Sequence, residues 1–117
     1  MYRMLIGCFI FVSAASFAET PQGVDRASPM TSFATHKSSD AFVQCVLDAS
    51  RSEFPASQVE SRQTSKLISI SRAPPAEVAA VVDVEDGGGG TRVVIIRTAS
   101  RAQPQRDPAV KIARNCQ

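Results

Sequence analysis

The sequence predicts an α+β domain in which a three-stranded antiparallel meander carries two helices on one face, in the order α-β-β-β-α. Apolar residues recur with helical spacing in residues 38–54 and 107–116. Between these segments, runs with a period of two or with many β-branched residues are typical of strands. Cys45 and Cys116 fall on the apolar faces of the two helices, where one disulfide would close the domain.

Residues 1–18 have the composition of a secretory signal peptide. Arg3 supplies a positive charge, an almost wholly apolar run extends from Met4 to Val12, and small residues lead up to Ala18. The apolar run is too short to span a membrane, which takes about 20 residues. We therefore expect cleavage near Ala18 and a periplasmic or secreted protein, with a retained N-terminal anchor as the alternative.

Cys8 ends the tetrapeptide LIGC, which resembles a bacterial lipid-attachment site. The apolar run continues from Phe9 to Val12, so cleavage before Cys8 would leave an exposed apolar tail. We expect Cys8 to be removed with the leader, and lipid anchoring there is the less favoured alternative. Removal leaves Cys45 and Cys116, and an even pair in an exported chain indicates a disulfide. A pair of reactive thiols would more often show CxxC spacing.

A segment without periodicity precedes the predicted domain. Residues 19–37 mix Pro, Gly, Ser and Thr, and we expect a flexible N-terminal segment there. The single small α+β domain is predicted to cover residues 38–117.

The first helix is predicted to begin at Ser38 or Ser39, either of which can cap it. Asp40 lies in the first turn, where the helix dipole favours a carboxylate. Pro55 stops the helix. The residues expected to face inward, at the spacing i, i+3, i+4 and i+7, are Phe42, Cys45, Val46 and Ala49.

Three extended segments follow the first helix. The clearest part of the first is Leu67–Ile70, and an earlier short strand around Val59 is left open. Residues 91–98 form a β-branched run typical of a strand. The glycines at 87–90 predict a hairpin with a loose turn and a weakly specified register. Residues 76–85 place alternate positions on one face, namely Val78, Ala80, Val82 and Val84.

The closing helix has a clear start. Asp107 is a good N-cap residue, and Pro108 suits the first helical position. Its predicted inward face consists of Ala109, Ile112, Ala113 and Cys116.

This plan resembles that of small exported envelope proteins and lipoproteins of proteobacteria, which carry a disulfide-closed α-β-β-β-α domain. The matching residues are Cys45, the hairpin around Gly87 to Gly90, and the closing Asn115-Cys116-Gln117. The chain lacks the aromatic residues that such proteins often carry in the helix and strands. The resemblance covers residues 38–117 and implies a location in the envelope.

The sequence offers no clear combination of nucleophile and histidine for nucleophilic catalysis. His36 is the only histidine and lies in or beside the flexible segment, so we expect it to be exposed and without a role. The glycine run is followed by Thr91-Arg92 and a strand, whereas a phosphate-binding loop needs Gly-Lys and a helix. We expect no catalytic residue and no cofactor.

The acidic turn is the one candidate for metal or acid–base chemistry. It contains Asp83, Glu85 and Asp86, but the twelfth position of a calcium loop counted from Asp83 is Val94 instead of Glu. We expect a solvated turn without metal. A small enzyme that uses these carboxylates is an alternative, and it requires them to converge on a pocket.

Basic residues accumulate in the last part of the chain, where Asp107 is the one acid. This asymmetry suits an anionic partner such as an acidic protein, lipid headgroups or a cell-wall polymer. Nucleic acid is disfavoured because we expect export and find no aromatic residues among the arginines. The candidate partner surface consists of Arg92, Arg97, Arg101, Arg106, Lys111 and Arg114.

Together these observations predict a non-catalytic periplasmic or secreted protein that acts by binding, most simply to another protein. Alternatives are an inhibitor or immunity protein against a toxin or hydrolase, a binder of the anionic envelope surface, and the small enzyme above.

Overall fold

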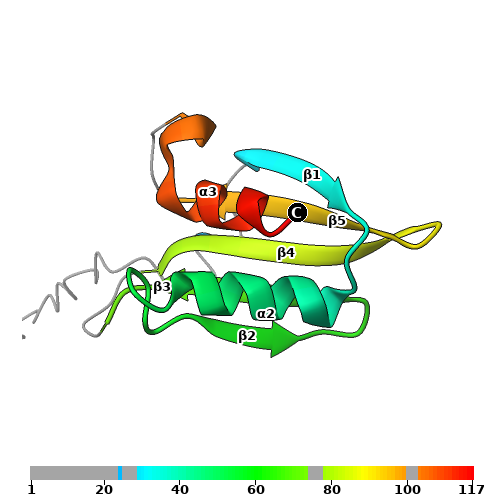
Figure 1. The fold of residues 1–117 in the computed structure, drawn as a ribbon, viewed down its shortest axis with the longest axis horizontal. Helices are drawn as coiled ribbons and strands as arrows, with labels where there is room; N and C mark the ends of the chain where they lie inside the picture. Colours follow the sequence, from blue (N-terminus) through cyan, green and yellow to red (C-terminus); the bar gives the residue numbers. More distant parts are fainter. Residues whose placement is uncertain (1–23, 25–28, 74–77, 100–102) are drawn as a thin grey trace, which may run out of the picture.

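A five-stranded antiparallel sheet carries two helices on one of its faces in the computed structural model of the chain (Figure 1). The expected leader, with Cys8 and the cleavage site near Ala18, lies outside the described residues, as does Arg101. The structure describes Val24 and residues 29–73, 78–99 and 103–117.

Strands β2 to β5 form a meander, and β1 is added beside β5, which gives the sheet order β1-β5-β4-β3-β2. Helix α2 follows β1 and precedes β2, so it joins the two edges of the sheet. The elements are β1 (Thr31–Thr35), α2 (Ser39–Ser50), β2 (Gln58–Ser61), β3 (Ser65–Ser71), β4 (Val78–Gly88), β5 (Thr91–Thr98), the 3₁₀ turn η1 (Pro104–Arg106) and α3 (Pro108–Asn115).

The prediction of a three-stranded meander is wrong in the number of strands. The three predicted strands correspond to β3, β4 and β5, and the segment around Val59 forms edge strand β2. Strand β1 lies inside residues 19–37, so the sheet begins earlier in the chain than expected. Its sequence, TSFAT, has no apolar alternation, and its pairing with β5 places Phe33 opposite Val94. This pairing is non-local and leaves little trace in the short sequence.

The main core lies between the helices and the near face of the sheet. Phe42 on α2 is fully buried and meets Phe33 of β1 edge to face, with ring centroids 6.2 Å apart. The sheet contributes Ile68, Ile70, Ala80, Val82, Val84, Val94 and Ile96, and the helices contribute Phe42, Val43, Val46, Ala109, Val110, Ala113 and Cys116.

Both helices are turned slightly from the predicted orientation. Ala49 is exposed, and Ser50 is buried in its stead. The hydroxyl of Ser50 donates to the carbonyl of Val46 at 2.6 Å, which satisfies the buried polar group. In α3, Val110 is buried more deeply than Ile112. The spacing of apolar residues does not predict a buried serine whose hydroxyl bonds to a carbonyl of its own helix.

A second, smaller cluster lies apart from the main core and consists of Val24, Leu67, Val78 and Val81. Val78 was expected to share a face with Ala80, but the register between β3 and β4 shifts between Ile70 and Ser71. Such an irregularity changes the side to which the following side chains point, and this accounts for the difference.

The hairpin between β4 and β5 is tight, which corrects the expectation of a loose turn. Only Gly89 and Gly90 lie between the paired residues Gly88 and Thr91. Gly89 and Gly90 have φ of 62° and 78°, both in the left-handed region. A two-residue turn with two positive φ angles matches the twist of antiparallel strands and is open mainly to glycine and asparagine.

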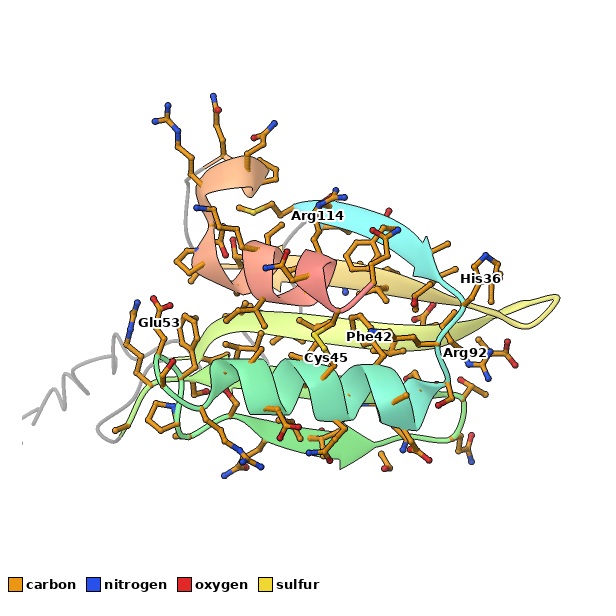
Figure 2. All side chains as sticks on the ribbon, viewed as in Figure 1. His36, Phe42, Cys45, Glu53, Arg92 and Arg114 are labelled. Carbon is orange, nitrogen blue, oxygen red and sulfur yellow. A yellow bond between two sulfur atoms is a disulfide. The ribbon has the colours of Figure 1, made fainter. Side chains whose placement is uncertain are left out.

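The predicted disulfide is confirmed. Cys45 of α2 and Cys116, the C-cap residue of α3, are bonded with their Cα atoms 5.8 Å apart (Figure 2). The bond ties the two helices together above the sheet. Within the described residues, neither helix is long and apolar enough to span a membrane.

The N-cap of α3 allows a first prediction on stability. Asp107 Oδ1 accepts hydrogen bonds from the backbone amides of Ala109 and Val110 at 2.9 and 3.2 Å. Asp107→Ala should lower the free energy of unfolding by about 1–2 kcal/mol, because these amides lose their acceptor. Asp107→Asn should be nearly neutral, since asparagine caps as well as aspartate. Urea denaturation checks both variants, and an Asp107→Ala midpoint equal to that of the parent would contradict the prediction.

Candidate functional site

The carboxylates of the acidic turn do not converge. Side chains of a strand alternate between faces, and Asp83 pairs in register with Leu67, whereas Asp86 pairs with Arg92. Asp83 is buried, and Glu85 is exposed. In the part of the chain that the structure describes, no three potential metal ligands gather.

His36 is exposed in the short connection between β1 and α2 (Figure 2). It therefore lies at the edge of the folded domain.

The candidate basic residues are distributed over several surfaces. Arg92 is the second residue of β5, and its Nε donates to Ser39 Oγ in the first turn of α2 at 3.2 Å. Arg97 pairs in register with Val81, a residue of the smaller cluster, and is therefore directed away from the main core. The other three described residues lie close together on η1 and α3, and we call them the η1–α3 basic face: Arg106, Lys111 and Arg114.

Two residues of the η1–α3 basic face, Lys111 and Arg114, line a hollow of about 430 Å³. Helical spacing places Lys111 and Arg114 on the outward side of α3. Arg114 is fixed in place, because its Nη2 donates to Thr31 Oγ1 at 3.0 Å and its guanidinium carbon lies 5.3 Å from the centre of the Phe33 ring. The hollow is lined by Pro104, Gln105, Val110, Lys111, Arg114 and Asn115.

The charge of this face has one sign. Arg106, Lys111 and Arg114 are exposed. Over the described residues 103–117, Asp107 is the only acidic side chain, and it is 4% exposed beneath the start of α3. Within residues 103–117 the face therefore presents three cations to solvent and no exposed acidic side chain.

Arg92 belongs to a different hollow, of about 420 Å³, at the start of α2. Here the charges are mixed. Lys66 bonds Asp40, and this hydrogen bond together with the lysine charge lowers the pKa of Asp40. Asp40 is fully exposed to solvent, so the pair is screened and contributes little to stability. The hollow is lined by Ser39, Arg62, Gln63, Thr64, Ser65, Lys66, Asp86 and Arg92.

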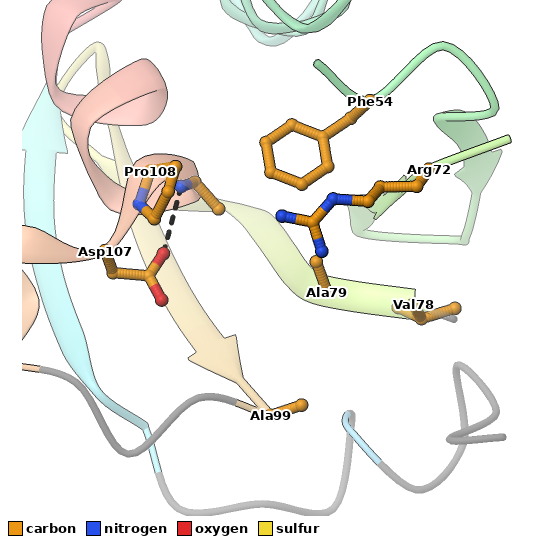
Figure 3. Close-up of a pocket in the computed structure, with 8 residues that line it drawn as sticks. Phe54, Arg72, Val78, Ala79, Ala99, Asp107 and Pro108 are labelled. Carbon is orange, nitrogen blue, oxygen red and sulfur yellow. Dashed lines mark hydrogen bonds between the residues drawn. The ribbon is translucent and has the colours of Figure 1, made fainter. Parts of the chain in front are cut away.

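A third cavity, of about 330 Å³, lies where α2, the sheet and α3 meet (Figure 3). Sequence reasoning missed it, because its residues come from five places in the chain and form no motif. The sequence pattern assigns Asp107 and Pro108 to the start of a helix and Val78 and Ala109 to apolar faces, and it assigns none of them to a binding site. The cavity is lined by Phe54, Arg72, Val78, Ala79, Ala99, Asp107, Pro108 and Ala109.

Comparison with known proteins adds no assignment to these surfaces. The chain matches no protein-family model, no curated protein and no solved structure. The candidate sites are therefore judged on their geometry and charge.

Proposed function

We propose that the chain is a non-catalytic, exported protein that binds an acidic protein through the η1–α3 basic face. The observation that carries this proposal is the set of three exposed cations on η1 and α3, of which Lys111 and Arg114 line one hollow, with no exposed acidic side chain within residues 103–117. Complementary charge speeds association and selects partners.

Export is supported by two features. The first is the leader-like composition of residues 1–18. The second is the Cys45–Cys116 disulfide, since such bonds persist in oxidising compartments and are rare in the cytosol. A periplasmic or secreted location after cleavage near Ala18 follows from the two together.

The shape of the face favours a protein over a lipid surface. Recognition of anionic lipid headgroups commonly uses clusters of about 4–8 basic residues, and this face has three. A hollow next to the fixed guanidinium of Arg114 suits a projecting carboxylate, because arginine binds carboxylates through two parallel hydrogen bonds. We therefore favour an acidic protein as the partner.

Charge reversal tests the proposal. Arg106→Glu combined with Lys111→Glu should weaken binding of the mature protein to poly-L-glutamate by about tenfold or more, because two attractive charges become repulsive. Arg114 is left unchanged, since it also contacts Phe33 and Thr31. Biolayer interferometry over a range of salt concentrations measures the affinity, and its salt dependence should also fall.

The matched control is the double variant Lys37→Glu and Arg51→Glu, which changes the net charge by the same amount. Lys37 lies just before α2 and Arg51 just after it, away from the η1–α3 basic face in the chain. Both control residues are exposed. An equal loss in both double variants would refute the proposal, because net charge alone would then explain binding. Salt-sensitive retention on phosphatidylglycerol vesicles without binding to poly-L-glutamate would refute the proposal of a protein partner. It would support binding to the anionic envelope surface instead.

A further inference from the structure

We propose that the cavity between Phe54, Arg72 and Asp107 binds a small zwitterion with an apolar body, such as a free amino acid with an aliphatic side chain. The inference goes beyond the proposed function, because this cavity shares no lining residue with the hollow of the η1–α3 basic face. The cavity volume of about 330 Å³ lies at the lower end of the range for small-molecule sites, about 300–1,000 Å³.

Arg72 supplies the positive side of the cavity. Its guanidinium carbon lies 5.2 Å from the centre of the buried Phe54 ring, which holds the charged group at the cavity wall (Figure 3). Its other charged neighbour is Glu53, with Nη2 and Oε1 3.9 Å apart, beyond hydrogen-bond distance. The guanidinium therefore keeps donors for a ligand carboxylate.

Asp107 supplies the negative side. Its side chain is 4% exposed, and the N-terminus of α3 favours a negative charge at this position. Oδ1 is occupied by the amides of Ala109 and Val110, whereas Oδ2 accepts no hydrogen bond from the described residues. Asp107 lines the cavity, and a ligand ammonium group there would donate a charge-assisted hydrogen bond to its carboxylate.

The two charged groups flank the same cavity but form no ion pair with each other. Figure 3 shows the guanidinium and the carboxylate on opposite sides, with Ala79 near the guanidinium. A ligand with a single charged group would contact only one of these two walls. A zwitterion satisfies both, with its carboxylate on Arg72 and its ammonium on Asp107.

The uncharged part of the cavity lining favours a ligand with an apolar side chain. The cavity is also lined by Val78 and Ala79 at the start of β4 and by Ala99, which follows β5. An aliphatic side chain of moderate size buries its surface against them, and each buried methylene group stabilises the complex by the hydrophobic effect.

The test uses L-leucine and two analogues that each lack one charge. L-leucinamide lacks the carboxylate, and 4-methylpentanoate lacks the ammonium group. Titration of the mature, disulfide-bonded protein is followed by NMR shifts of the amides of Ala79, Ala99 and Ala109. L-leucine should bind saturably with a Kd below about 1 mM. Each analogue should bind about tenfold more weakly, because one charge-assisted hydrogen bond is lost.

Two variants locate the site. Arg72→Gln and Asp107→Asn should each weaken L-leucine binding about tenfold, because each removes one charge and keeps a similar shape. Asp107→Asn also keeps the cap of α3, so loss of folding is not expected. The matched control is Arg51→Gln, at an exposed arginine that does not line the cavity, and it should bind as the parent does.

The proposal is overturned if L-leucine causes no saturable shifts, or if the three probes bind equally. It is also overturned if Arg72→Gln binds L-leucine as tightly as Arg51→Gln. The comparison of the three probes uses the unaltered protein, so it tests the proposed zwitterion site even if a variant fails to fold.

Discussion

Removal of the Cys45–Cys116 disulfide should lower the free energy of unfolding by about 4 kcal/mol, because the bond closes a long loop in the unfolded chain. The two cysteines are 71 positions apart, and the entropy lost on closing a loop grows with its length. Domains of this size are stable by about 5–15 kcal/mol. The bond therefore accounts for a large share of the stability.

The double variant Cys45→Ala and Cys116→Ala tests this expectation by urea denaturation, beside the parent with and without reductant. The variant and the reduced parent should both unfold at a lower urea concentration than the oxidised parent. Reductant should leave the variant unchanged, which separates loss of the bond from other effects of the reagent. An unchanged midpoint in the variant, or thiols that alkylate without reductant, would contradict the prediction.

Phe42→Ala should lower the free energy of unfolding by about 3–5 kcal/mol. Phe42 is fully buried and contacts Phe33, so its truncation leaves a cavity between α2 and the sheet and removes the edge-to-face contact. Phe42 belongs to the main core cluster, so the cavity would lie within that core.

Phe42→Leu is the graded comparison and should cost less, since it keeps most of the apolar volume. The surface control is Val59→Ala on edge strand β2, where the residue is 43% exposed. That change should alter stability by less than about 0.5 kcal/mol. Equal effects of Phe42→Ala and Val59→Ala on the unfolding midpoint would show that Phe42 is not central to the core.

Several elements were predictable because the rules that specify them act within a few residues. Ser38 caps α2 and Asp107 caps α3, as the sequence indicated. Strand β5 has the predicted bounds, since its β-branched run stands alone between two turns. The disulfide followed from the number of cysteines and from their positions on the apolar faces of two helices.

Other features were not predictable, because they depend on pairing between distant segments. Strand β1 forms because it pairs with β5, and its own sequence has no apolar period. The shift between Ile70 and Ser71 that sends Val78 to the smaller cluster arises where β3 meets β4. Neither is encoded in the spacing of apolar residues.

The same distinction between local and long-range features applies to the candidate site residues. The sequence grouped six basic residues by their position in the chain. Of the five that the structure describes, Arg106, Lys111 and Arg114 lie on η1 and α3, whereas Arg92 and Arg97 lie on β5. The separation of Asp83 from Asp86 was foreseeable, since neighbouring strand positions of opposite parity point to opposite faces.

The sequence by itself determined the class of fold, the two helices with their caps, the central strands and the cysteine pair. Hydrogen-bonding groups and apolar periods within single segments are sufficient for the helices and strands, whereas the cysteine pair also followed from the number of cysteines. Only the tertiary structure decided the five-stranded sheet and the meeting of Phe54, Arg72 and Asp107 around a cavity. Those features require contacts between residues far apart in the chain, and such contacts form when the main core packs.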